Sequence, residues 1–160
     1  MTLPETADAV IVGGGILGLS AAWHLTRSHA GMPHAGMRVL VLERNGLATA
    51  ATAQAAALMT SARPDAATAA LVADTYAAIP RLEEETGESL DLNRVGTLHV
   101  AGTPATAGAL AGMTGERLDG AAAVRLAPWL DADAVAAARF VPEDGYLDPA
   151  RLANAYAHAA

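Results

Sequence analysis

Three glycines near the N-terminus, Gly13, Gly15 and Gly18, have the spacing GxGxxG. They follow four apolar residues, Ala9–Val12, and precede an apolar segment that is typical of a helix. In such a turn the first glycine permits a sharp change of direction, the second lets a pyrophosphate approach the backbone, and the third lets helix and strand pack closely. The first N–H groups and the dipole of the helix attract phosphate. The alternative is a plain strand–helix connection, because glycine-rich turns are common.

Glu43 stands at the end of a second apolar segment, Val39–Leu42, which the pattern predicts to be a buried strand. In a dinucleotide-binding fold an acidic residue there accepts hydrogen bonds from the adenosine ribose, and its charge repels the extra phosphate of NADP. Gly18 and Glu43 lie further apart than the usual spacing of about 20 residues, and the excess falls in a predicted loop at residues 27–37. A solvated glutamate at a strand end is the alternative, and the surrounding strand–turn–helix–strand pattern favours the ribose role.

Composition limits the classes of function. The chain has 160 residues, of which 52% are hydrophobic and 17% charged, as expected for a folded domain. Its net charge of −7 without a basic cluster argues against nucleic acid as a partner. It has no cysteine, and its histidines show no metal-ligand spacing, so we expect neither disulfides nor a metal site. Neither a signal peptide nor a membrane span is apparent, and we expect a cytoplasmic protein.

The region after the second strand makes the comparison with known families specific. The chain resembles the N-terminal part of the FAD-dependent D-amino-acid oxidase superfamily, which includes glycine, sarcosine and dimethylglycine oxidases and dehydrogenases. The resemblance rests on GxGxxG-x-S-x-A at residues 13–22, VLVLER at 39–44, and a Thr-x-x-Ala-Ala-x-Leu segment matched by Thr52, Ala55, Ala56 and Leu58. VGTLHVA at 95–101 and DGYLDPARLANAYAHAA at 144–160 are also similar. Many flavoproteins share the first two motifs; the later ones are moderately specific together.

The resemblance implies FAD as the cofactor and assigns roles to residues of this sequence. Gly13, Gly15 and Gly18 would hold the pyrophosphate, Glu43 the adenosine ribose, and Arg44 would lie beside the adenine. Thr52, Ala53 and Gln54 would run under the phosphates and the ribityl chain toward the flavin ring. The small residues at 48–57 suit a backbone that lies against a cofactor, and a poly-alanine helix is the alternative for this stretch.

Two positions bear on the chemistry that the resemblance implies. Dimethylglycine-type relatives carry a histidine covalently joined to the flavin where this chain has Gln54. Because glutamine cannot form that bond, we expect noncovalent FAD. Arg63 stands where several relatives have an arginine close to the flavin ring, and its planar guanidinium can bind both oxygens of an amino-acid carboxylate. Arg63 is therefore the candidate catalytic residue, and a solvent-facing arginine before Pro64 is the alternative.

The remaining sequence predicts elements but little chemistry. Asp65 is a good N-cap for a helix with apolar residues at helical intervals, which Pro80 is expected to break or kink. Strands are predicted at 95–100 and 140–141, and helices at 103–113, at 119–126 and after Asp148. The predicted fold class is α/β, with a Rossmann-type FAD-binding segment at 1–65, the beginning of an α+β substrate domain at 66–143, and the start of a helix returning to the FAD domain at 144–160.

The predicted function is oxidation of the C–N bond of an amine or amino acid by hydride transfer to flavin. In the family the second half of the protein completes both domains. The chain is therefore expected to be a fragment or a subunit, inactive by itself, that needs a C-terminal half or a partner chain. Two alternatives are an NAD-dependent oxidoreductase and a noncatalytic cofactor-binding fragment.

Overall fold

The computed structural model describes residues 4–27, 36–63 and 65–160, so most of the predicted loop at 27–37, and Pro64, lie outside it. The chain forms two compact units. Unit 1 consists of Met1–Ala57, Ala77–Asp91 and Leu147–Ala160, and unit 2 of Leu58–Tyr76 and Leu92–Tyr146. The chain thus leaves unit 1 and returns to it twice. The predicted domain segments 1–65, 66–143 and 144–160 divide the chain at other residues and stay a prediction.

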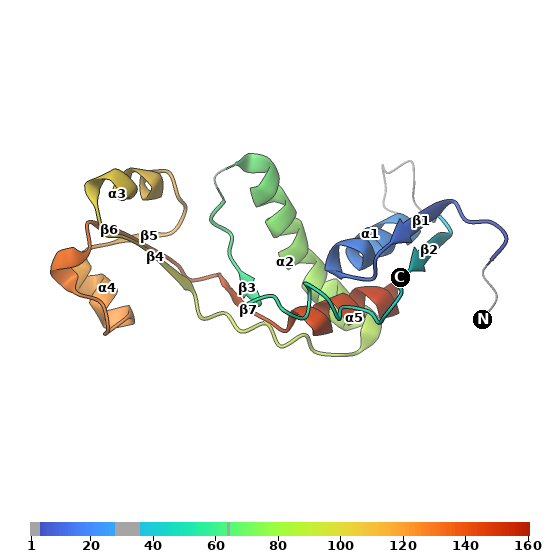
Figure 1. Cartoon of the computed structure of the whole chain (residues 1–160). Coiled ribbons are helices and arrows are strands. Elements are labelled where there is room, and N and C mark those ends of the chain that lie inside the picture. The colour runs from blue at the N-terminus through green and yellow to red at the C-terminus, as the bar shows by residue number, and fades with distance from the viewer. Residues whose placement is uncertain (1–3, 28–35, 64) are drawn as a thin grey trace. The chain divides into compact units, whose positions relative to one another are not determined.

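The sheet of unit 1 consists of two parallel strands, β1 (Ala9–Val12) and β2 (Val39–Leu42), drawn in Figure 1. They pair with Ala9 opposite Val39 and Val12 opposite Leu42. Helix α1 (Ile16–Thr26) begins directly after the glycine turn and lies between the two strands in the sequence. Both predicted strands and the predicted helix are therefore confirmed, and this unit has the β–α–β order that a parallel pair requires.

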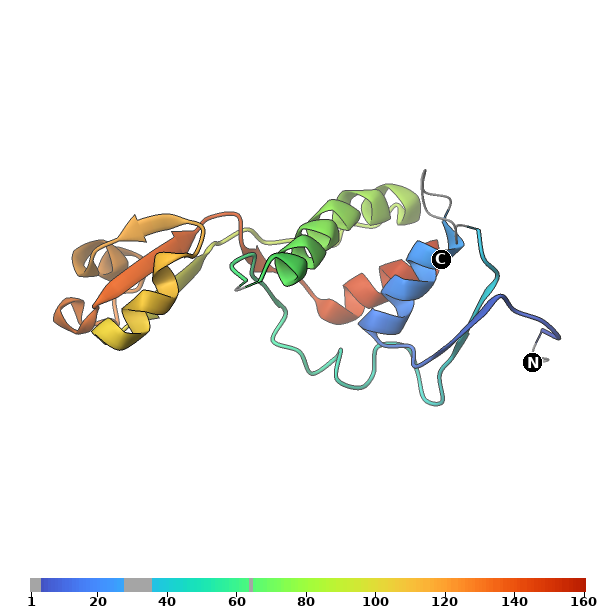
Figure 2. The ribbon, with the colours of Figure 1, turned by 90° about the horizontal axis from the view of Figure 1, so that it is seen from above.

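Three helical segments form the core of unit 1: α1, the C-terminal part of α2 (Ala66–Thr86), and α5 (Pro149–Ala159). α1 and α5 lie side by side in both views (Figures 1 and 2). As predicted, Asp148 caps α5, since its carboxylate accepts from the N–H groups of Ala150 at 2.8 Å and Arg151 at 3.2 Å. The buried core side chains of these helices are Leu19, Ala22, Trp23, Ala78, Ile79, Leu82, Leu152, Ala153, Ala155 and Tyr156.

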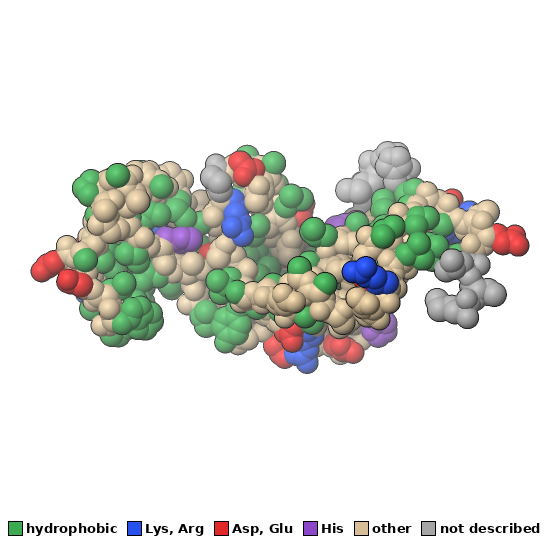
Figure 3. Space-filling view, viewed as in Figure 1, with side chains coloured by type: hydrophobic (Ala, Val, Ile, Leu, Met, Phe, Trp, Pro, Cys, Tyr) green, Lys and Arg blue, Asp and Glu red, His purple; other side chains and the backbone are tan. Residues whose placement is uncertain are grey.

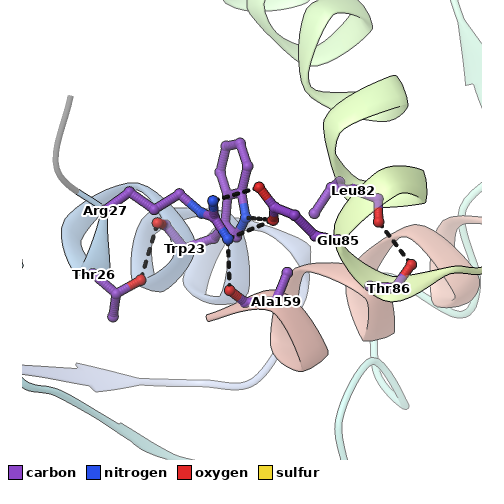
Figure 4. A network of polar contacts seen from close by, with 7 residues as sticks. All are labelled: Trp23, Thr26, Arg27, Leu82, Glu85, Thr86 and Ala159. Carbon is purple, nitrogen blue, oxygen red and sulfur yellow. Dashed lines mark hydrogen bonds and ion pairs between the residues drawn. The ribbon is translucent and has the colours of Figure 1, made fainter. Parts of the chain in front are cut away.

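A polar network joins the same three helices (Figure 4). Trp23 donates from Nε1 to Glu85 Oε2 at 3.1 Å, and Arg27 forms an ion pair with the same carboxylate. The guanidinium of Arg27 lies 4.5 Å from the centroid of the Trp23 ring and donates to the carbonyl of Ala159 at 2.8 Å. The ring of Tyr156 also packs edge-to-face against Trp23, with the two ring centroids 5.5 Å apart. These contacts fix the helix that begins at the glycine turn.

Helix α2 begins after Asp65, whose carboxylate accepts from Thr68 N–H at 2.8 Å, as predicted. It continues through Pro80 to Thr86, so the expected continuation over residues 82–86 is confirmed, the expected break is absent, and the expected kink stays a prediction. Pro80 removes one backbone hydrogen bond, but Ala78, Ile79 and Leu82 are buried beside it. Burial of these apolar side chains favours the continuous helix despite the missing bond.

Unit 2 contains an antiparallel sheet of order β4–β6–β5, formed by β4 (Thr97–Ala101), β5 (Glu116–Leu118) and β6 (Ala137–Val141). It also contains α3 (Pro104–Ala111), α4 (Gly120–Leu126), a 3₁₀ turn (Ala132–Ala134) and a pair of two-residue strands, β3 (Leu58–Met59) and β7 (Gly145–Tyr146). The strands predicted at 95–100 and 140–141 and the helices predicted at 103–113 and 119–126 are confirmed with shifted ends. The short strands β3, β5 and β7 were not predicted.

Candidate cofactor site

The glycine turn has the geometry that its spacing predicts. Gly13 has a φ of 113°, in the region that favours glycine, and its N–H donates to the carbonyl of Leu42 at 2.8 Å. A Cβ atom on Gly18 would lie 2.1 Å from the carbonyl oxygen of Gly13. Only glycine therefore allows α1 to approach the end of β1 so closely.

Gly14 is a site residue that the GxGxxG spacing does not mark. A Cβ atom there would lie 2.6 Å from the side chain of Leu47 and 3.1 Å from that of Glu43. Its carbonyl also accepts from Ala48 N–H at 2.8 Å. The turn is therefore held against the segment that follows β2. The run of three glycines in the sequence was the available signal.

Glu43 bridges the glycine turn and the end of β2. Its Oε2 accepts from Gly14 N–H at 2.8 Å and its Oε1 from Asn45 N–H at 2.9 Å. The hydrogen bonds from Asn45 and then Gly14 hold the pKa of the Glu43 carboxyl below its ordinary value. Each carboxylate oxygen has a second lone pair, so an ionised and fixed Glu43 can still accept from ribose hydroxyls.

Thr52 reaches the N-terminus of α1 from a distant part of the chain. Thr52 is a buried residue, and its Oγ1 accepts from Ile16 N–H at 3.0 Å. The N-cap residue of α1, Gly15, has no side chain to do this, and a Cβ there would lie 3.2 Å from Thr52 Oγ1. The hydroxyl proton of Thr52 remains able to donate to an anion. A phosphate at this helix end would thus meet both backbone and side-chain donors.

The alanine-rich segment around Thr52 is not a helix, so the poly-alanine alternative is wrong. Residues 47–54 form successive turns, with i to i+3 bonds such as Ala53 N–H to the carbonyl of Ala50 at 3.1 Å. Ala48 has a φ of 58°, which breaks helical geometry. Ala53 and Gln54 are exposed in these turns. Small side chains leave the backbone accessible here, as the predicted cofactor contact requires.

A pocket of about 410 Å³ opens at the carboxyl ends of β1 and β2. It is lined by Val12, Gly13, Leu42, Glu43 and Arg44. Ligands of open α/β sheets bind at this end of the strands. The glycine cradle, the α1 terminus and the fixed carboxylate all belong to unit 1, and their donors and acceptor suit the pyrophosphate and ribose of a dinucleotide.

Arg63, by contrast, belongs to unit 2 and is exposed. It has no hydrogen bond or ion pair with any residue that the structure describes.

Among the described residues, no group of three or more histidine, aspartate or glutamate side chains could hold a metal ion. No helix in the described part of the chain is long and apolar enough to cross a membrane.

Comparison with known proteins agrees with this geometry. A family model described as FAD dependent oxidoreductase matches residues 8–160. Dimethylglycine dehydrogenase, mitochondrial, of Rattus norvegicus is 32% identical over 166 residues, which are 98% of this chain and 19% of the relative. Sarcosine dehydrogenase, mitochondrial, of Homo sapiens is 32% identical over 168 residues, 99% of this chain and 18% of the relative. The chain thus spans about a fifth of the length of the curated relatives it matches.

Among solved structures, glycine oxidase from Geobacillus kaustophilus superimposes with a TM-score of 0.72 at 25% identity. The match covers 96% of this chain and 44% of that enzyme. The predicted α/β class and the predicted resemblance are confirmed by these matches.

Proposed function

Because the chain belongs to the FAD-dependent oxidoreductase family, we propose that it carries the FAD-binding part of an enzyme that oxidises the C–N bond of an amine or amino acid. The family match favours FAD over NAD. The names of two relatives mention sarcosine and dimethylglycine, and both molecules are N-methylated amino acids with a free carboxylate. The observation that carries the proposal is the glycine turn with Glu43 and Thr52 fixed around it.

In this proposal the residues of unit 1 bind and orient the cofactor. Gly13 makes the turn, Gly18 lets α1 pack against it, and Gly15 leaves room for the pyrophosphate at the start of α1. The hydroxyl of Thr52 donates a hydrogen bond to the pyrophosphate. Glu43 accepts from the ribose, and Arg44 lies beside the adenine. Bound FAD supplies the electron-accepting chemistry, and the protein supplies placement and electrostatics.

Two further parts of the proposal concern the flavin end. Gln54 stands where dimethylglycine-type relatives have the histidine that is covalently joined to the flavin, so FAD is held noncovalently here. Ala53 and Gln54 lie along its ribityl chain. Arg63 binds the substrate carboxylate through its guanidinium, and its exposure is compatible with this role. The predicted cytoplasmic location stays a prediction, and the two dehydrogenase relatives are mitochondrial by name.

The test is a titration of the apoprotein with FAD and, in parallel, with NAD. We expect binding of FAD and not of NAD, and loss of FAD binding in Gly15→Val, because a branched side chain would occupy the pyrophosphate space. Gly108→Val is the matched control, since a side chain at this exposed glycine meets no atom within 4 Å. Equal flavin content in Gly15→Val and the unmodified chain would contradict the assignment.

We also propose that turnover needs a C-terminal half or a partner chain. Apolar side chains outside the cofactor pocket support this: Leu17 is 85% exposed and Trp129 is 83% exposed. Figure 3 shows hydrophobic side chains gathered on the surface over α4 and around β1 and β2. Exposed apolar surface of this kind favours association. Amine-dependent bleaching of the flavin by the isolated chain would overturn this part and leave the assignment of FAD intact.

A further inference from the structure

A buried carboxylate in unit 2 holds the segment that leads to Arg63. Asp144 is 0% exposed and directly precedes β7. Its Oδ1 accepts from the backbone N–H of Ser61 at 2.8 Å and from the hydroxyl of the same serine at 2.7 Å. One carboxylate oxygen of Asp144 therefore accepts from both hydrogen-bond donors of Ser61, which lies two positions before Arg63.

The second oxygen of Asp144 makes this arrangement costly. Oδ2 is buried and has no hydrogen-bond partner among the residues that the structure describes. No arginine or histidine in those ranges forms an ion pair with this carboxylate. Burial of a half-satisfied carboxylate costs free energy that a neutral side chain would avoid. Such a group in a native fold requires an explanation beyond packing.

Neighbouring contacts hold the same segment from other sides. β3 pairs with β7 through Leu58 opposite Tyr146 and Met59 opposite Gly145. The hydroxyl of Tyr76 donates to the carbonyl of Met59 at 2.8 Å. Together with the hydrogen bonds from Ser61 to Asp144, these contacts hold the backbone at residues 58, 59 and 61.

Arg63 itself has nothing else to orient it within the described part of unit 2. Its guanidinium lies outside every hydrogen bond and ion pair formed there, and the side chain is exposed. Two residues of extended chain span at most about 7 Å, so the position of Ser61 closely limits where Arg63 can be. The backbone that Asp144 holds therefore limits the region that the guanidinium of Arg63 can reach.

We propose that Asp144 is a positioning residue: by holding Ser61 it fixes the backbone that presents Arg63 to the carboxylate of the substrate. This inference rests on the proposed carboxylate-binding role of Arg63. It adds a residue from the other end of the sequence to the substrate site, and Ser61 as its contact.

The experiment measures binding of acetate, a carboxylate without an amine, to the FAD-loaded protein by the change in the flavin absorption spectrum. Dimethylamine, an amine without a carboxylate, is titrated in parallel. Arg63→Ala, Asp144→Ala, Asp144→Asn and Ser61→Ala are compared with the unmodified protein. Asp133→Asn is the matched control, because Asp133 is an exposed aspartate of unit 2.

We expect Arg63→Ala and Asp144→Ala each to weaken acetate binding roughly tenfold or more, as for the loss of a charge-assisted hydrogen bond. Ser61→Ala should weaken acetate binding less, since the backbone N–H of residue 61 still donates to Asp144. Asp144→Asn should bind acetate more tightly than Asp144→Ala, because its amide oxygen can still accept from Ser61. Flavin content and the response to dimethylamine should stay unchanged, as should every property of Asp133→Asn. A purely structural role would instead lower flavin content and the responses to both probes together.

Different outcomes would overturn the role of Arg63 and the role of Asp144. Unchanged acetate binding in Arg63→Ala, or no response of the unmodified protein to acetate, would overturn the role of Arg63 and the inference with it. Weakened binding in Arg63→Ala alone would overturn the inference and leave Arg63 in place. If Asp144→Ala does not fold, the Ser61→Ala and Asp144→Asn variants decide. Acetate affinities in both variants equal to that of the unmodified protein would overturn the positioning role.

Discussion

The Gly18→Ala substitution tests the close approach of α1 to the end of β1. Its added Cβ would lie 2.1 Å from the carbonyl oxygen of Gly13 and 3.1 Å from the side chain of Ile11. The first neighbour is backbone, so the helix or the turn must move. Alanine favours a helix over glycine by about 0.5–1 kcal/mol, whereas forced overpacking costs about 1–3 kcal/mol. We expect a net destabilisation of roughly 1 kcal/mol, within the range of about 0–2.5 kcal/mol that the two opposing effects allow.

The same movement should weaken FAD binding. If the shifted turn loses one charge-assisted hydrogen bond to the pyrophosphate, worth about 1.5–3 kcal/mol, affinity falls roughly tenfold or more. Urea unfolding followed by tryptophan fluorescence reports mainly on unit 1, because Trp23 is 1% exposed and Trp129 is 83% exposed. Gly108→Ala in α3 is the matched control and should change neither the Trp23 transition nor FAD affinity, since nothing lies within 4 Å of its Cβ. A Gly18→Ala protein as stable as the original, with the same FAD affinity, would show that α1 tolerates a side chain at this position.

Three further predictions concern the same site. Thr52→Val removes the acceptor of Ile16 N–H and should lower the stability of unit 1 by about 1 kcal/mol, measured by urea unfolding; an unchanged midpoint would contradict the capping role. Glu43 has a folded pKa below the ordinary 4.5, so its stabilising contribution is complete above that value and is lost as pH falls through the folded pKa. Glu43→Gln should therefore flatten the acid limb of the pH–stability curve, and an identical limb would count against it. With Gln54 at the family's histidine position, acid precipitation should release all flavin into the supernatant, whereas flavin in the pellet would show a covalent bond.

The sequence predicts well those features that depend on neighbouring residues. The apolar strands, the glycine turn, and the caps Asp65 and Asp148 each act over a few positions, and the structure has them where expected. β3 was missed because it has two residues, and its partner β7 lies near the other end of the chain. Strand pairing of this kind leaves no local signal.

The unpredicted site residues share that physical cause. A side chain at Gly14 would displace Leu47, whose approach depends on the turns after β2. Nothing in the sequence around Asp144 indicates its contact with Ser61, which spans 83 positions. The alanine-rich composition favours a helix, but the left-handed Ala48 and the contact of Thr52 with α1 select turns instead.

The contact between Arg27 and the carbonyl of Ala159 has a consequence for biosynthesis. These residues are 132 positions apart, and a ribosome adding about 5–20 residues per second needs on the order of 10 s to cover that interval. Until α5 emerges, the nascent chain has a glycine turn and an apolar α1 whose Trp23 lacks its aromatic neighbour Tyr156. Non-local closure of this kind slows folding. Nascent α1 therefore offers an apolar surface to chaperones while the residues between α1 and α5 are being translated.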